Sequence, residues 1–146
     1  TEQIIDDDLL VIAGDNLFGF SLNHFIRFFL EKKTPVVAFH DLKDLEIVKG
    51  RYGVGILQGT KIVDFEEKPS LPRSALASTA CYIFPKHSLS EIKYYIQQGT
   101  FDNLGDLIKW MADRNELHGF VFEEHWFDIG SFESLNKAEK VYSKFS

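Results

Sequence analysis

Cysteine, methionine and proline are scarce in this chain. Its 146 residues include 1 cysteine, 1 methionine and 4 prolines. A single cysteine, Cys81, cannot form a disulfide within the chain, so we expect a reducing, cytoplasmic location. Cys81 lies in the apolar run 80–84, which predicts a small buried side chain rather than a reactive thiol.

Basic residues and long apolar runs are also in short supply. The chain has 16 Lys and Arg against 22 Asp and Glu, which gives a net charge of −6. An acidic surface repels a phosphate backbone, so nucleic acid is not an expected partner, although a local basic pocket can still bind a phosphorylated small molecule. No apolar run approaches the roughly 18 residues of a membrane helix, so we expect no membrane partner either.

The rest of the composition is that of a globular domain. Hydrophobic residues make up 45% of the chain and charged residues 26%, which excludes a disordered tail, a collagen-like repeat and a coiled coil. The length suits one domain, and we expect a single domain over residues 1–146. The 14 phenylalanines supply large side chains for its core.

Strand-like and helix-like runs alternate along the chain. The run 9–13 is continuously apolar, which predicts a strand buried on both faces. The helix after it leads to a second strand at 36–39, which predicts a parallel pair with a right-handed crossover. Ser88 and Glu91 have the spacing of a capping box. Together the runs predict an α/β fold with a mixed sheet. The expected strands are 9–13, 36–39, 52–57, 61–65, 77–84, 117–122 and 126–129, with a hairpin turn at 58–60, and the expected helices begin at Ser21, Ser88, about residue 104, and Ser131.

Two aspartates stand beside strand-like runs far apart in the chain. Asp15 follows the run 9–13, and Asp128 lies in an apolar stretch just before Ser131. Ligands of open α/β sheets bind beyond the carboxyl ends of the strands, and Mg²⁺ takes carboxylate oxygens together with phosphate oxygens. The two aspartates are therefore a candidate Mg²⁺ site. The structural alternatives are a plain turn at Asp15 and a helix N-terminus at Asp128.

A carboxylate and an ammonium group are adjacent at the end of the expected hairpin. Glu67 and Lys68 stand directly before Pro69. A carboxylate accepts hydrogen bonds from hydroxyl groups, and an ammonium group neutralises phosphate. The pair is a candidate site for a polyhydroxylated, phosphorylated ligand, and the alternative is a solvated ion pair.

These features occur in an order that resembles one enzyme family. The segments in chain order are VIAGDNLF, GRYGVGIL, VDFEEKP, STACYIF and WFDIGSFESLNKAEK. Together they resemble the sugar-1-phosphate nucleotidylyltransferases, and Leu17-Phe18 after Gly-Asp-Asn is typical of the glucose-1-phosphate thymidylyltransferase branch. The resemblance implies a Rossmann-like mixed sheet with flanking helices, the C-terminal part of a nucleotide-diphospho-sugar transferase fold. The implied reaction is Mg²⁺-dependent nucleotidyl transfer from a nucleoside triphosphate, with dTTP favoured, to a sugar 1-phosphate, with glucose 1-phosphate favoured, and release of pyrophosphate.

The same resemblance implies roles for individual residues. Asp15 and Asp128 would be the Mg²⁺ ligands of the reaction. Lys68 would contact the sugar phosphate as a catalytic and binding group, and Glu67 would accept hydrogen bonds from sugar hydroxyls. The sugar pocket would be completed by Gly53, which offers its backbone, and by Tyr82, which lines the wall.

The chain also departs from the family pattern. The glycine-rich segment that cradles the triphosphate is not found in the sequence, and Ala80 stands where the family often has glycine. We therefore expect the sugar-binding part of such an enzyme, inactive by itself. The alternatives are a non-catalytic sugar-phosphate-binding or oligomerising subunit of the same ancestry, and a structural domain. Because an uncovered sheet edge promotes pairing, we also expect a homo-oligomer.

Overall fold

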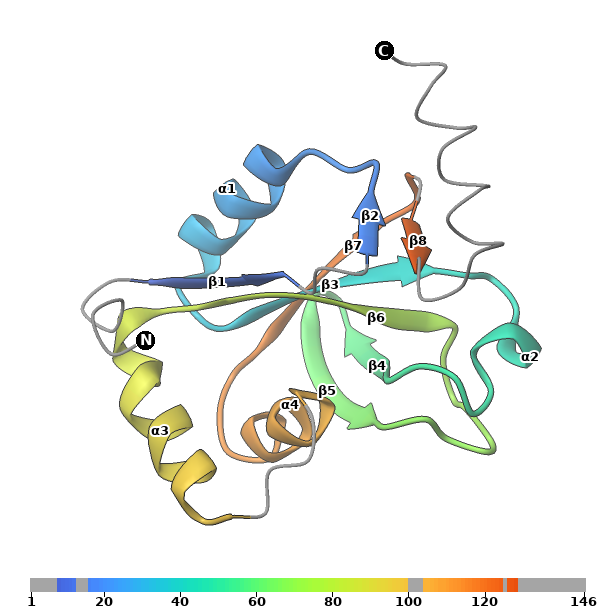
Figure 1. Cartoon of the computed structure of the whole chain (residues 1–146). Helices are drawn as coiled ribbons and strands as arrows, with labels where there is room; N and C mark the ends of the chain where they lie inside the picture. The colour runs from blue at the N-terminus through green and yellow to red at the C-terminus, as the bar shows by residue number, and fades with distance from the viewer. Residues whose placement is uncertain (1–7, 13–15, 100–103, 125, 129–146) are drawn as a thin grey trace.

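The structure, a computed structural model, describes residues 8–12, 16–99, 104–124 and 126–128. Strands and helices alternate along it (Figure 1). The expected helix from Ser131 lies outside the described residues. The elements in chain order are β1 (Leu9–Ile12), β2 (Asn16–Phe18), α1 (Leu22–Lys32), β3 (Val36–Asp41), α2 (Leu45–Val48), β4 (Val54–Gln58), β5 (Lys61–Glu66), β6 (Leu76–Phe84), the 3-10 turn η2 (Lys86–Ser88), α3 (Leu89–Gln97), α4 (Leu104–Ala112), β7 (His118–Phe122) and β8 (Trp126–Asp128).

A six-stranded sheet in the order β1-β6-β3-β7-β5-β4 forms the middle layer. Helix α1 lies on one face of it, and α3 and α4 lie on the other (Figure 1). Strand β3 shows how the sequence fills both faces. Val36 and Ala38 pack in the cluster that contains α1, whereas Val37 and Phe39 pack in the cluster that contains α3 and α4. Burial on both sides explains the continuous apolar run of β3 and confirms the predicted α/β class with a mixed sheet.

The hairpin of β4 and β5 closes five of the six strands into a circuit of pairings. Its two strands pair antiparallel around Gly59, as predicted. Single residue pairs join it to its neighbours: Val54 pairs with Ala77 of β6, and Lys61 pairs with His118 of β7. Strands β6, β3, β7, β5 and β4 are thereby connected in a closed circuit.

The phenyl ring of Phe39 lies inside this circuit of strands, against Gly55 and Gly119. A β-carbon on Gly55 would lie 2.5 Å from Phe39 Cζ, and one on Gly119 would lie 2.9 Å from Phe39 Cδ2. The two glycines therefore make room for a ring that is completely buried. This packing fixes the hairpin against β3, and the hairpin carries the candidate site.

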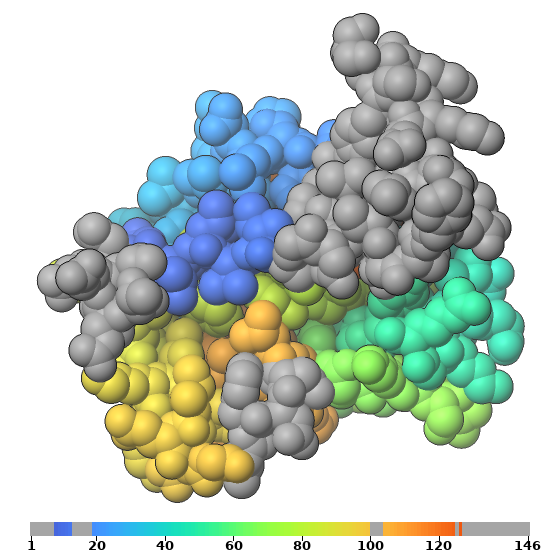
Figure 2. Space-filling model, viewed as in Figure 1, coloured from blue at the N-terminus to red at the C-terminus, as the bar shows by residue number. Residues whose placement is uncertain are grey.

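Strand β1 differs from the expectation in two ways. Leu10 and Ile12 are 39% and 43% exposed, so the prediction of a strand buried on both faces is wrong. Strands β1 and β3 run parallel, as predicted, but they are not neighbours, because β6 lies between them and pairs antiparallel with both. Among the described strands β1 lies at the edge of the sheet, and Figure 2 shows its residues at the surface between α1 and α3.

The helices confirm one of two predicted caps. The Ser21 side chain accepts a hydrogen bond from the His24 N–H at 3.3 Å, as a helix cap does. The Ser88 side chain makes no capping hydrogen bond at α3. Glu91 Oε1 instead accepts from Asn115 Nδ2 at 2.7 Å, so the predicted capping box is wrong. Within the described ranges every helix is too short or too polar to cross a membrane.

Candidate functional site

The open end of the β4–β5 hairpin places a carboxylate over a glycine. Val54 pairs with Glu66, so the next residues outward, Gly53 and Glu67, come opposite each other. A β-carbon on Gly53 would lie 3.2 Å from Glu67 Oε2 and 2.5 Å from Phe65 Cζ. Phe65 is completely buried and leaves no room for a side chain at position 53. Glycine at this position is therefore required by the packing of Phe65, and it lets the Glu67 carboxylate lie close to the backbone of residue 53.

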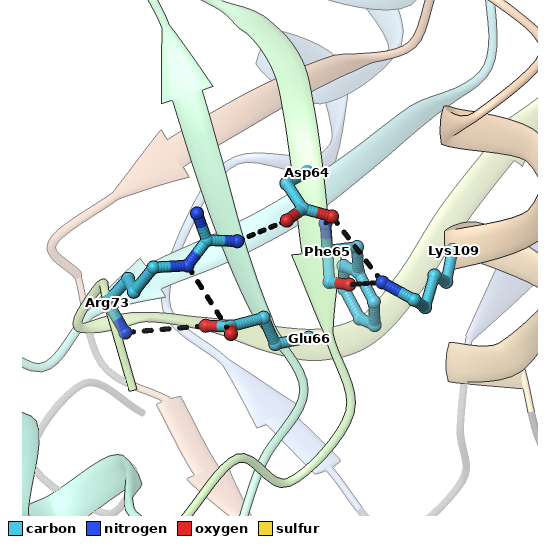
Figure 3. A network of polar contacts seen from close by, with 5 residues as sticks. All are labelled: Asp64, Phe65, Glu66, Arg73 and Lys109. Carbon is cyan, nitrogen blue, oxygen red and sulfur yellow. Dashed lines mark hydrogen bonds and ion pairs between the residues drawn. The ribbon is translucent and has the colours of Figure 1, made fainter. Parts of the chain in front are cut away.

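The neighbouring acidic residues of β5 are engaged elsewhere. Successive side chains of a strand point to opposite faces, and Figure 3 shows Asp64 and Glu66 directed toward Arg73. Arg73 forms ion pairs with Asp64 and with Glu66 Oε2, the latter at 3.4 Å. Lys109 of α4 adds a contact to Asp64 Oδ1 at 3.5 Å. Glu66 is therefore neutralised by a cation, and Glu67 is the glutamate that faces Gly53.

The environment of Glu67 is partly apolar. Burial raises the pKa of Glu67, Lys68 acts in the opposite direction, and Asp106 of α4 adds to the rise. Lys68 itself has a left-handed backbone, with φ of 46°, and its N–H donates to the Tyr52 carbonyl at 3.2 Å. This turn ends the hairpin and leaves the Lys68 side chain exposed beside the Glu67 carboxylate.

Strand β6 contributes two hydroxyl groups to the same place. The Ser78 N–H donates to the Gly53 carbonyl at 2.7 Å, and Ser78 Oγ lies 3.4 Å from the Tyr82 hydroxyl oxygen. Tyr82 is 3% exposed, and burial raises its pKa to about 12, with Ser78 opposing the rise and Glu67 adding to it. The Tyr82 hydroxyl is therefore protonated at neutral pH and can donate a hydrogen bond.

Three residues that the resemblance assigned to the sugar thus lie together, namely Gly53, Glu67 and Tyr82, and Lys68 is adjacent to Glu67 in the chain. Ser78 is a fourth member that sequence reasoning missed. The available signal was its position in STACYIF, four residues before Tyr82, but a regular strand separates such residues by about 13 Å.

One of the two predicted Mg²⁺ ligands, Asp128, belongs to a second, two-stranded sheet. Strands β2 and β8 pair antiparallel, and Asn16 is the partner of Asp128 in this ladder. Asp15, which precedes Asn16 in the chain, lies outside the described residues, and only the backbone of Asp128 is described. In the described parts of the chain no group of three or more His, Cys, Asp or Glu is placed to hold a metal. The side chains of the two predicted ligands, Asp15 and Asp128, are not among those described.

Aromatic rings connect the two parts of the candidate site. The Trp126 ring, at the start of β8, lies 5.1 Å from the Tyr52 ring and 5.8 Å from His40. Tyr52 directly precedes Gly53. Burial lowers the pKa of His40, against the effects of the Phe122 backbone and nearby carboxylates. No sequence pattern indicates this cluster, because its members come from three separate segments.

A groove of about 380 Å³ lies at the other end of β5. It is lined by residues 61–63 and 112–116, which include none of the predicted site residues. The chemistry that suits a sugar phosphate is at the Gly53 end instead: an acceptor carboxylate, a protonated hydroxyl group and an ammonium group within one small region.

Solved structures share this fold. A crystal structure from Bacillus anthracis, assigned as a glucose-1-phosphate thymidylyltransferase and holding a sucrose, matches with a TM-score of 0.80 and 29% identity, over 96% of this chain and 56% of that one. A UDP-glucose pyrophosphorylase complexed with UDP-glucose matches with a TM-score of 0.79 at 23% identity, over 99% of this chain and 59% of that one. The fold is therefore a nucleotidyltransferase fold, and the predicted Rossmann-like mixed sheet with flanking helices is confirmed.

Sequence comparison identifies the family. The chain belongs to the nucleotidyl transferase family, whose model matches residues 1–144. A glucose-1-phosphate adenylyltransferase of Bacillus thuringiensis (strain Al Hakam) is 28% identical over 147 residues, which cover 93% of this chain and 37% of that protein. One from Thermosipho melanesiensis is 26% identical over 133 residues, covering 88% and 32%. The chain spans about a third of the length of these curated relatives. The predicted resemblance to the sugar-1-phosphate nucleotidylyltransferases is confirmed.

Proposed function

We propose that the chain provides the sugar-phosphate site of an enzyme that transfers a nucleotidyl group from a nucleoside triphosphate to a sugar 1-phosphate and releases pyrophosphate. Glucose 1-phosphate is the proposed acceptor. The relatives at 28% and 29% identity are named for different nucleotides, adenylyl and thymidylyl, but both names contain glucose 1-phosphate. We propose dTTP as the donor because of the sequence Leu17-Phe18 after Gly-Asp-Asn.

The observation that supports this proposal best is the Glu67 carboxylate over Gly53. Its Oε2 lies 3.2 Å from the position of a β-carbon on Gly53, next to a buried tyrosine hydroxyl. An acceptor carboxylate beside a donor hydroxyl group suits the ring hydroxyls of a hexose. The adjacent Lys68 ammonium group suits the phosphate.

The reaction requires little covalent chemistry from the protein. A phosphate oxygen of the sugar 1-phosphate attacks the α-phosphorus of the triphosphate, the bond to the pyrophosphate oxygen breaks, and pyrophosphate leaves. Positioning and charge neutralisation dominate such catalysis. In this proposal Glu67, Gly53 and Tyr82 orient the sugar, and Lys68 neutralises the attacking phosphate.

We propose Asp15 and Asp128 as the ligands of Mg²⁺. Carboxylate oxygens are the donors that Mg²⁺ takes, and the pairing of Asn16 with Asp128 supports a shared position for the two motifs. When bound, Mg²⁺ neutralises charge on the phosphates of the triphosphate.

Isothermal titration of the 146-residue chain with glucose 1-phosphate tests the proposal. We expect saturable binding of glucose 1-phosphate, with glucose and inorganic phosphate each much weaker, because the site contacts both parts of the molecule. Inorganic phosphate binding as tightly as glucose 1-phosphate would show a simple anion site. With dTTP and Mg²⁺ present, we expect no pyrophosphate release from the chain alone. Measurable release would refute the expectation that the chain is inactive by itself.

A further inference from the structure

Strand β6 contains two more residues than β3 across the same stretch of the sheet. Between two matched pairs β3 advances by two residues, from Val37 to Phe39, while β6 advances by four, from Ser78 to Tyr82. The extra residues bulge out of the ladder. Such bulges redirect the side chains on either side of them.

Ala80 is at the centre of this bulge, with φ of 58°. A left-handed backbone is unfavourable for a residue with a β-carbon, so other contacts must hold it. The Thr79 side chain provides one: it is completely buried, and its hydroxyl group donates to the Ala38 carbonyl at 2.8 Å. That contact satisfies a carbonyl of β3 opposite the bulge.

The bulge determines where the Tyr82 hydroxyl group lies. In a regular strand, residues four apart are separated by about 13 Å, whereas the two-residue span of β3 that Ser78 and Tyr82 match is about 7 Å. Only the shorter span lets the Tyr82 hydroxyl come within 3.4 Å of Ser78 Oγ. Because the Ser78 N–H is bonded to the Gly53 carbonyl, this contact brings the tyrosine hydroxyl to the Gly53–Glu67 site.

We infer that Ala80, through its left-handed bulge, is a positioning residue for the Tyr82 hydroxyl group in the sugar-phosphate site. The inference rests on the proposed function and extends it. The proposed role of Ala80 is indirect: it sets the distance between Ser78 and Tyr82. Ala80 keeps a backbone conformation that glycine adopts without cost.

A binding cycle with glucose 1-phosphate tests the inference. The variants are Ala80→Gly, which favours the bulge, and Ala80→Val, whose branched side chain opposes a positive φ. Each is measured with and without Tyr82→Phe by isothermal titration of the whole chain. We expect Ala80→Gly to bind within about twofold of the wild type, and Tyr82→Phe to weaken both by about three- to tenfold, the effect of one hydrogen bond. Ala80→Val should weaken binding as much, and adding Tyr82→Phe to it should change nothing further.

The coupling between positions 80 and 82 separates positioning from mere stability. A folded Ala80→Val protein that binds as well as the wild type, or that still loses affinity with Tyr82→Phe, would overturn the inference. If Ala80→Val does not fold, Thr79→Val replaces it, since it removes the Ala38 contact at nearly constant volume. If that variant does not fold either, Ala80→Gly decides, and a loss of affinity equal to that of Tyr82→Phe would refute the inference. Absence of glucose 1-phosphate binding by the wild type would refute the proposed function itself, and the inference with it.

Discussion

Replacing Gly53 by alanine disturbs both the core and the candidate site. The new β-carbon would lie 2.5 Å from Phe65 Cζ and 3.0 Å from Phe65 Cε1. Carbon atoms in contact are normally about 3.5–4.0 Å apart, so the ring or the backbone must move by about 1–1.5 Å. Phe65 is completely buried, and its neighbours resist that movement. Overpacking of this kind costs about 1–3 kcal/mol, which lowers the melting temperature of a domain of this size by about 2–12 °C.

Thermal and urea unfolding of Gly53→Ala, Phe65→Leu and the double variant measure this cost. A leucine at position 65 lacks the ring atoms that meet the new methyl group. Gly53→Ala should therefore destabilise the Phe65→Leu protein less than it destabilises the wild type, a coupling that a double-mutant cycle detects. A Gly53→Ala protein with the melting temperature of the wild type, and no coupling to position 65, would refute the close packing at this site.

Four further predictions follow from buried and charged groups. Burial raises the pKa of Cys81 to about 12, so we expect the thiol to resist disulfide reagents in the folded chain and to react on unfolding; stoichiometric labelling of folded protein would contradict this. Burial raises the pKa of Glu67 above its ordinary value of 4.5, so the free energy of unfolding should fall as pH rises from that value through the raised pKa. Urea unfolding of the Glu67→Gln protein should lack this fall. If the free energies of unfolding of the wild type and of Glu67→Gln change with pH in parallel, the prediction is refuted. Burial works to raise the pKa of Asp64, but hydrogen bonds from the Phe65 N–H and Arg73 lower it overall. The Asp64 carboxylate therefore stabilises the fold above its ordinary pKa of 3.8, and this effect is lost as pH falls through the lowered pKa. In the Arg73→Ala protein, NMR titration of the Asp64 carboxyl group should give a higher pKa than in the wild type, and an unchanged pKa would contradict the ion pair. Strand β1 lies at the edge of the sheet among the described strands and exposes Leu10 and Ile12, so we expect self-association. Sedimentation showing only monomer at micromolar concentration would count against it.

Local signals predicted the elements that depend on local contacts. The β4–β5 hairpin follows from two strand-like runs separated by a short turn at Gly59, which takes a positive φ of 64°, and the α1 cap follows from Ser21. Predictions from local sequence were wrong where a segment far away in the chain forms the contact. Nothing near β1 indicates that β6 will insert beside it, and nothing near Glu91 indicates a bond to Asn115 in place of a capping box.

The same distinction holds for the candidate site. The acidic and basic groups at Glu67 and Lys68 are visible in the sequence, and their roles came from the order of several motifs. The choice of Glu67 over Glu66 becomes physical only in the structure, where Arg73 pairs with Glu66 and Gly53 lies under Glu67. The part played by Ser78 depends on a bulge of β6 that no periodicity predicts.

The central claim is that the Glu67 carboxylate accepts hydrogen bonds from the sugar hydroxyls of glucose 1-phosphate. The adjacent residues Glu66 and Glu67 offer its most direct test. Glucose 1-phosphate affinity is measured by isothermal titration for the wild type, Glu67→Gln and Glu66→Gln. The two substitutions remove the same charge one residue apart, and Glu66 already has its partner in Arg73. We predict that Glu67→Gln weakens binding about tenfold or more, as loss of a hydrogen bond to a charged group does, while Glu66→Gln leaves it within about twofold. Equal affinities for the two variants would contradict the account.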